Sequence, residues 1–328
     1  MLQPLTFSTP SEEITVATDS TGTVHFLDSQ FLLLAKWSAV PEAEPLMVPP
    51  SASPHVLIVA MPSGRVYGVS TQIANLGAQL WSVDVAPHVI VGAPLVLLNA
   101  WWATTTDGNV VMGNITSGVV TLVPAPLCGG QPPSFNTGPT LRDSFSNGIV
   151  TVTTSGCVVA VSKFGSVQWS LDPLVSYNAS LPVSMPPVVD SGAAHVYFAS
   201  EDGYVCCLLS SGSYPCGQWQ TPCVALHNSA PLVGGLALSP STTYFHEGQL
   251  FGMTSAGVLW AVYTATGNAV SSQSVLIAGA MTAAPILVPN GLGNLNNVLP
   301  TIGLMHEEMP PAFSIESQIR FLHKKRTV

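Results

Sequence analysis

One pattern recurs six times along this chain: a run of strand-forming residues, a tight turn with glycine, and a second such run. The six copies read EITVATDSTGTVHFLDS, VLIVAMPSGRVYGVS, AWWATTTDGNVVMGN, GIVTVTTSGCVVAVS, HVYFASEDGYVCCLL and LFGMTSAGVLWAVYT. Their turn glycines are Gly22, Gly64, Gly108, Gly156, Gly203 and Gly257, spaced 42 to 54 residues apart. Glycine takes positive φ without steric cost, so short strands around such a turn predict a β-hairpin. Six hairpins at a nearly regular period predict a repeat fold.

Two further features accompany the hairpins. Short segments of proline and aliphatic residues precede them, at Pro4, Pro45, Pro94, Pro139, Pro187, Pro231 and Pro285. A proline can open a short strand, because its missing N–H can face an end or edge of the sheet. Four units close with a strand predicted to end in tryptophan, at Trp37, Trp81, Trp169 and Trp219. Each unit of roughly 45 residues therefore holds about four short strands, which is the size of one β-propeller blade.

This order of strands resembles the quinoprotein-type (PQQ-like) β-propeller repeat, from about residue 4 to residue 290. The resemblance implies that Trp37, Trp81, Trp169 and Trp219 are blade-docking residues. Val123 stands near the corresponding place in the third unit, and the sixth unit has no tryptophan there. We expect an all-β chain: a β-propeller of four-stranded blades, with six complete PQQ-like repeats plus a partial seventh that starts near Pro285.

The predicted propeller spans residues 1–305, and residues 306–328 form a C-terminal tail of different composition. We expect the tail to be a short helix or a disordered segment. The seventh unit is not followed by a turn glycine and a closing tryptophan strand. The ring either closes with six or seven blades or belongs to a longer chain, and we slightly favour truncation or an altered C-terminus.

Charge is scarce and unevenly distributed. The chain has 17 acidic and 8 basic residues, and four of the basic residues lie within the last nine positions. The remainder lacks the basic surface that phosphate binding requires, so we predict no nucleic-acid partner. The longest apolar stretch, 86–103, is interrupted by prolines and polar residues, so we expect no membrane span. The N-terminus shows neither the basic nor the apolar region of a signal peptide.

Other features favour an extracytoplasmic or secreted protein. The sequence contains two acceptor motifs for N-linked glycosylation, Asn114-Ile-Thr and Asn178-Ala-Ser. The low lysine content and the six cysteines point the same way, because disulfides persist in oxidising compartments.

The cysteines allow more than one interpretation. Four of the six, Cys206, Cys207, Cys216 and Cys223, fall within 18 residues but lack the paired spacing of a zinc site. Adjacent residues of a strand point to opposite faces, so we do not expect Cys206 and Cys207 to bond to each other. Buried free thiols are favoured, a single disulfide such as Cys216–Cys223 is the next alternative, and a metal or cofactor role is the third.

A quinoprotein dehydrogenase would need an acidic base and a calcium ion beside pyrroloquinoline quinone. Asp107, Glu201 and Asp202 are candidate carboxylates, but all three lie beside turn glycines, where acidic residues stabilise the turn itself. The histidines show no ligand spacing, and no nucleophile or phosphate-binding motif is present. We therefore predict a non-catalytic scaffold without a cofactor, which binds a protein partner through its loops or central face. The alternative is a PQQ-dependent dehydrogenase, or a fragment of one, with quinone and calcium.

Overall fold

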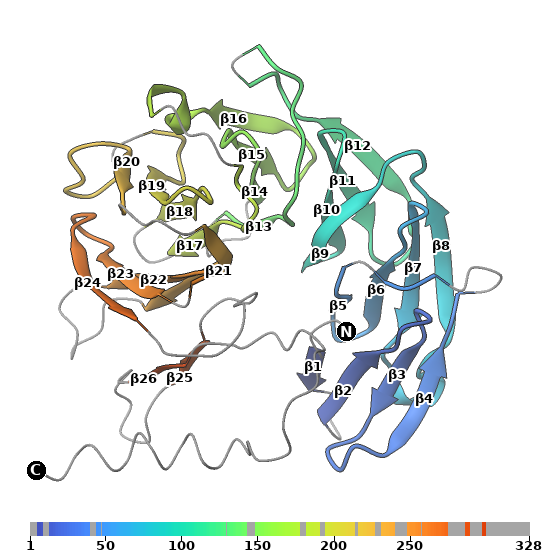
Figure 1. The fold of residues 1–328 in the computed structure, drawn as a ribbon. Helices are drawn as coiled ribbons and strands as arrows, with labels where there is room; N and C mark the ends of the chain where they lie inside the picture. The colour runs from blue at the N-terminus through green and yellow to red at the C-terminus, as the bar shows by residue number, and fades with distance from the viewer. Residues whose placement is uncertain are drawn as a thin grey trace, which may run out of the picture.

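In the computed structural model, the chain forms six four-stranded antiparallel sheets, which follow one another around a ring (Figure 1). A seventh sheet has two strands. The residues described are 5–8, 13–39, 44–46, 48–128, 130–142, 148–177, 182–190, 194–213, 216–226, 231–239, 248–256, 258–274, 286–288 and 297–299.

Each of the six sheets is built from strands in chain order, and each strand pairs with the next one. Sheets 1 to 3 consist of β1 (Leu5–Ser8), β2 (Glu13–Thr18), β3 (Val24–Leu27) and β4 (Leu33–Trp37); β5 (Ser51–Ala52), β6 (Val56–Ala60), β7 (Arg65–Ser70) and β8 (Gln79–Asp84); and β9 (Ile90–Leu97), β10 (Ala100–Thr105), β11 (Asn109–Asn114) and β12 (Val120–Pro124). Sheets 4 to 6 consist of β13 (Thr140–Leu141), β14 (Gly148–Val152), β15 (Val158–Ser162) and β16 (Val167–Leu171); β17 (Val188–Asp190), β18 (His195–Ala199), β19 (Tyr204–Leu209) and β20 (Cys223–Ala225); and β21 (Leu232–Ser239), β22 (Gln249–Thr254), β23 (Val258–Tyr263) and β24 (Ala269–Ser274). The two-stranded sheet pairs β25 (Ile286–Val288) with β26 (Asn297–Leu299), and two 3₁₀ helices, η1 (Ile73–Asn75) and η2 (Pro173–Ser176), lie in connections.

The first strands of successive sheets line the inside of the ring. Contacts join β1 to β5, β5 to β9, β13 to β17, β17 to β21, and β21 to β25. This arrangement confirms the predicted all-β propeller, with six complete units followed by a smaller two-stranded one. The predicted domain boundary at residue 305 and the tail 306–328 lie outside the described residues.

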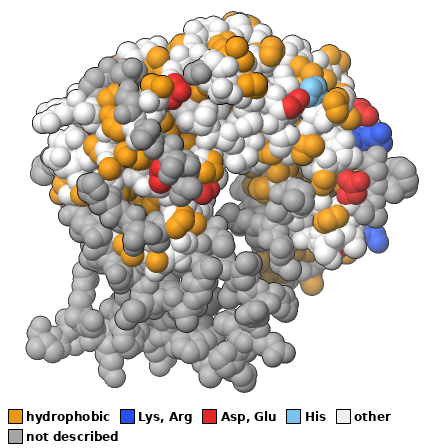
Figure 2. All heavy atoms as spheres, turned by 45° about the horizontal axis from the view of Figure 1, so that its top comes forward, with side chains coloured by type: hydrophobic (Ala, Val, Ile, Leu, Met, Phe, Trp, Pro, Cys, Tyr) orange, Lys and Arg blue, Asp and Glu red, His pale blue; other side chains and the backbone are white. Residues whose placement is uncertain are grey.

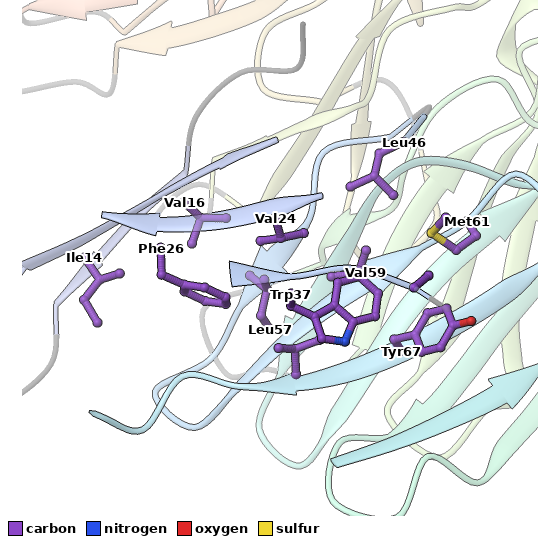
Figure 3. Close-up of a cluster of buried hydrophobic side chains, with 12 residues drawn as sticks. Ile14, Val16, Val24, Phe26, Trp37, Leu46, Leu57, Val59, Met61 and Tyr67 are labelled. Carbon is purple, nitrogen blue, oxygen red and sulfur yellow. The ribbon is translucent and has the colours of Figure 1, made fainter. Parts of the chain in front are cut away.

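The core consists of apolar clusters, most of which join neighbouring sheets. In the first cluster, Trp37 of β4 meets Tyr67 of β7 edge-on, with ring centroids 4.9 Å apart (Figure 3). Leu57 and Val59 of the second sheet belong to the same cluster as Val16 of the first. In the second and fourth sheets, the second and third strands are buried almost throughout, because neighbouring sheets cover both of their faces.

The first strands depart from the prediction in two units. Five of the seven prolines, at positions 4, 139, 187, 231 and 285, directly precede the first strand of a sheet in the sequence, as expected. Pro94 instead lies inside β9, where the register with β10 shifts. The segment after Pro45 is not a strand, and the second sheet begins at Ser51, after two further prolines whose missing N–H groups cannot join a ladder.

Candidate functional site

The antiparallel order gives every sheet two different ends. One end carries the turns between first and second strands and between third and fourth strands; we call it the 3–4 face. The other end carries the turns between second and third strands and the connections to the next sheet; we call it the 2–3 face. Of the predicted turn glycines, Gly22, Gly64, Gly108, Gly156 and Gly203 lie on the 2–3 face with φ between 80° and 91°, and Gly257 lies outside the described residues.

Three of the four predicted tryptophans donate a hydrogen bond to the following sheet on the 3–4 face. The indole N–H of Trp81 donates to the carbonyl of Ile115 at 2.8 Å, and that of Trp169 donates to the carbonyl of Ser210 at 3.2 Å. Trp219 donates to the carbonyl of Thr264 at 2.9 Å. Each acceptor lies in or beside the third-to-fourth-strand connection of the next sheet. The role of these tryptophans in docking one blade against the next stays a prediction.

A glycine in the receiving turn accompanies each of these indoles. Gly118, Gly212 and Gly267 lie so close to Trp81, Trp169 and Trp219 that a Cβ atom would collide with the ring. The sequence reasoning missed these glycines. The repeated glycine after the third strand was the signal that could have revealed them.

The tryptophan positions also differ from the expectation of strand ends. Only Trp37 ends a strand; Trp81 and Trp169 lie in the middle of β8 and β16, and Trp219 precedes β20. An indole near the start of the fourth strand is closer to the 3–4 face, and that position explains why it reaches the next sheet's turn.

All six cysteines form disulfides, which corrects the expectation of free thiols. The pairs are Cys128–Cys157, Cys206–Cys223 and Cys207–Cys216. The alternative pairing Cys216–Cys223 is also wrong. Cys206 and Cys207 each have their own partner, because neighbours on β19 point to opposite faces of the sheet. Cys206 lies directly opposite Cys223 in the ladder between β19 and β20.

Carboxylates gather on the 2–3 face. Seven of the ten described acidic residues lie there, as Asp19, Glu44, Asp84, Asp107, Asp172, Glu201 and Asp202. Hydrogen bonds from the His25 ring, then from Thr21, hold the pKa of Asp19 well below its usual value. Burial opposes ionisation of Asp107, but hydrogen bonds from Thr105 and His88 outweigh it and lower its pKa. These carboxylates hold their own turns together.

The carboxylates proposed for a quinone site do not converge on one. Asp107 accepts from Thr105 Oγ1 at 2.6 Å in the third sheet, and Asp202 accepts from Ser200 in the fifth. Within the described ranges, the one group of potential metal ligands is His195 with Cys207 and Cys216, whose two sulfurs form a disulfide. This set does not fit a quinone-bound calcium ion, which takes oxygen ligands.

The 3–4 face carries the exposed apolar side chains. Seven large apolar residues are more than 60% exposed, and five lie on this face: Phe31, Leu32, Leu98, Val119 and Phe164. The other two, Leu127 and Val175, lie on the 2–3 face. Figure 2 draws one side of the molecule, on which carboxylates are scattered among apolar and uncharged polar groups and few lysine or arginine side chains appear.

Two separate apolar regions can be distinguished on the 3–4 face. The first, which we call the edge patch, consists of Phe31, Leu32, Leu33 and Leu34 with Ile73. A hollow of about 260 Å³ lies beside it, between Leu34 of β4 and helix η1 of the second sheet. The second region is a groove of about 700 Å³ between the third and fourth sheets, lined by Leu98, Val119 and Phe164 among others.

Two of the three described non-glycine residues with positive φ lie in these regions, Phe31 in the edge patch and Leu98 in the groove. Three described non-glycine residues have positive φ, and all three lie in turns of the 3–4 face: Phe31 at 61°, Leu98 at 53° and Ala194 at 54°. This conformation costs an L-residue about 1 to 2 kcal/mol. Such strain clusters at functional positions, which makes the edge patch and the groove the candidate sites.

The apolar edge patch was not recognised from the sequence. A short run such as FLLL is equally consistent with a buried strand, so its hydrophobicity gives no sign of exposure. The preceding Asp28 was a usable signal, because its carboxylate accepts from the backbone N–H groups of Gln30 and Leu32 and marks a turn.

The folded arrangement defines the class of protein: a β-propeller. Three solved structures are similar to it. BamB from Moraxella catarrhalis is 18% identical over 79% of this chain and 68% of its own, with a TM-score of 0.51. The computationally designed Ika8 protein is 14% identical over 82% and 74%, with a TM-score of 0.59. The Cps50 (Swd1) β-propeller domain of Myceliophteria thermophila is 12% identical over 84% and 86%, with a TM-score of 0.56.

These likenesses show the fold alone, because all identities are below 20%. No protein-family model and no curated protein matches the chain. Membership of the PQQ-like repeat family therefore stays a prediction. In the part of the chain that the structure describes, no helix has the length and apolar character needed to cross a membrane.

Proposed function

We propose that this chain is a non-catalytic propeller scaffold that binds another protein through the edge patch on its 3–4 face. The single observation that carries the proposal is the exposed run Phe31–Leu34, which spans the turn before β4 and the first two residues of β4, the outermost strand of the first sheet. Proteins manage exposed strand edges with charge, proline or a cover. The strand β4 carries one such charge, Lys36, but Leu33 and Leu34 at its start are 57% and 42% exposed.

The chemistry of the patch favours an extended apolar segment as the occupant. An outer strand offers main-chain groups that a partner strand can pair with, and side-chain pockets then select the sequence. The hollow between Leu34 and Ile73 of helix η1 has room for one large apolar side chain. None of the residues that line the hollow is charged, so an uncharged segment fits best.

The three disulfides support an oxidising, extracytoplasmic setting for this interaction. Each joins segments within one sheet or its entry connection, so the propeller is reinforced locally. A rigid scaffold presents its binding residues with little loss of conformational entropy on association.

The test compares co-purification of partners by three forms of the full chain, isolated under native conditions. The double variant Phe31→Ser/Leu34→Ser disrupts the patch, and Leu127→Ser removes a leucine that is 66% exposed on the opposite face. We expect a stoichiometric partner with the wild type and with Leu127→Ser, and its loss from the double variant. Equal recovery by both variants would contradict the proposal, as would the absence of any stoichiometric partner.

A further inference from the structure

The groove between the third and fourth sheets carries a residue that the scaffold proposal does not use. Asn114, the last residue of β11, is exposed and lines this groove. It opens the motif Asn114-Ile115-Thr116, the acceptor sequence for N-linked glycosylation. We propose that Asn114 carries an N-linked glycan, and that the first sugars of this glycan lie across the apolar groove.

The local geometry leaves the reactive atom available. The Oδ1 atom of Asn114 accepts hydrogen bonds from the backbone N–H groups of Thr116 and Ser117, both at 2.9 Å. The backbone N–H of Asn114 donates to Val119 at 2.8 Å, and its carbonyl accepts from Gly118 at 2.9 Å. The backbone and the amide oxygen are therefore fixed, whereas Nδ2 makes no hydrogen bond within the described residues.

Glycan attachment preserves these contacts. The Nδ2 atom attacks the anomeric carbon of a polyprenyl-diphosphate-linked oligosaccharide, a C–N bond forms, and the bond from that carbon to the phosphate oxygen breaks. One amide proton leaves to a base of the transferase, and the polyprenyl diphosphate departs. The product keeps Oδ1 and one N–H, so the turn that Oδ1 holds remains intact.

The surroundings of Asn114 give the sugars a surface to pack on. Three apolar side chains around the groove are largely exposed: Leu98 at 69%, Val119 at 68% and Phe164 at 80%. Contact of such a patch with water is unfavourable unless another group covers it. The C–H faces of a pyranose ring are apolar and remove such side chains from water. Lys163, whose Nζ lies 5.3 Å from the centre of the Phe164 ring, can donate hydrogen bonds to sugar hydroxyls.

The disulfides give independent support. N-linked transfer takes place in the compartments where disulfides form, and all six cysteines of this chain are paired. The second motif, at Asn178, lies outside the described residues. The groove is separate from the edge patch, so the glycan proposal and the scaffold proposal can fail independently.

The first experiment is peptide mass spectrometry of the full chain purified from its native source. After reduction, trypsin releases residues 66–142 as one peptide, because no lysine or arginine lies between Arg65 and Arg142. Asn114 is the only acceptor motif in this peptide. We expect a glycopeptide that peptide N-glycosidase converts to the form with aspartate at position 114. A peptide with unmodified Asn114 would overturn the proposal.

Two variants test the motif, and a dye tests the packing. Expressed in the secretory pathway of a eukaryotic host, Thr116→Val should lose the glycan at Asn114, whereas Thr116→Ser should keep it. Enzymatic removal of the glycan from the folded wild type should increase fluorescence of the apolar probe ANS. The same treatment of Thr116→Val should leave the fluorescence unchanged. Retention of the glycan by Thr116→Val would contradict the attachment site, and unchanged ANS fluorescence of the deglycosylated wild type would contradict packing in the groove.

Discussion

Two buried tryptophans in one core cluster provide a controlled test of how neighbouring sheets are held together. Trp219 and Trp260 are 2% and 3% exposed and pack in the same cluster. The N–H of Trp219 donates to the carbonyl of Thr264 in the next sheet, whereas the N–H of Trp260 is buried without an acceptor among the described residues. We predict that Trp219→Phe destabilises the chain more than Trp260→Phe.

The difference between the two substitutions can be worked out from these contacts. Both remove the same atoms from equally buried sites, so the transfer and cavity contributions largely cancel. Trp219→Phe additionally breaks a hydrogen bond worth about 0.5 to 1.5 kcal/mol, and the Tyr197 hydroxyl, 3.4 Å from the same carbonyl, limits the further loss. Trp260→Phe removes an unpaired donor whose burial costs about 1 to 3 kcal/mol. Together the two effects predict a difference in unfolding free energy of about 1.5 to 4.5 kcal/mol.

The measurement is urea-induced unfolding followed by far-UV circular dichroism, which does not depend on tryptophan fluorescence. The comparison is valid when both variants unfold with the same dependence on urea as the wild type. Equal midpoints, or a lower midpoint for Trp260→Phe, would refute the claim that the indole N–H holds the next sheet.

Three further outcomes follow from the same structure. Gly118→Ala forces a Cβ to within 2.7 Å of an indole, whereas Gly130 has a similar positive φ and open space around it. Gly118→Ala should therefore cost about 1 to 3 kcal/mol more than Gly130→Ala, and equal thermal unfolding would refute this packing. The pKa of Asp107 is lowered on folding, so its contribution to the unfolding free energy is complete above the unfolded pKa of about 4 and is lost as pH falls through the folded value. The unfolding free energies of Asp107→Asn and wild type should therefore converge below about pH 4, and curves that stay parallel would exclude the effect. Replacing Cys206 and Cys223 by alanine should lower the unfolding free energy by about 3 kcal/mol, because their disulfide closes a loop of 17 residues. An unchanged denaturation midpoint would show that the disulfide does not constrain the unfolded chain.

The architecture was predictable because the repeat is encoded locally. Strand-forming runs around a turn glycine specify a hairpin without knowledge of the rest of the chain, and six copies specify how the hairpins assemble. The same reasoning failed after Pro45, where an aliphatic segment looked like a strand but β5 begins only at Ser51. Local strand propensity cannot decide which of two neighbouring segments forms the edge strand of a sheet.

The candidate site and the cysteine pairing were not predictable in the same way. The pairing of Cys206 with Cys223 depends on which residues the ladder of β19 and β20 places opposite each other, and this register is not visible in the spacing. The edge patch depends on exposure, and the run Phe31–Leu34 reads the same whether it is buried or not. Both properties emerge only when the sheets are assembled.

Site-specific photo-crosslinking tests the central claim most directly. A photoreactive phenylalanine analogue is placed at Phe31 on the edge patch, and in a matched protein at Leu127 on the opposite face; the two native side chains are 72% and 66% exposed. The account predicts one discrete adduct with a different protein from position 31 and none from position 127. Adducts from position 127 alone, adducts only with a second copy of this chain, or no adduct from either position would contradict it.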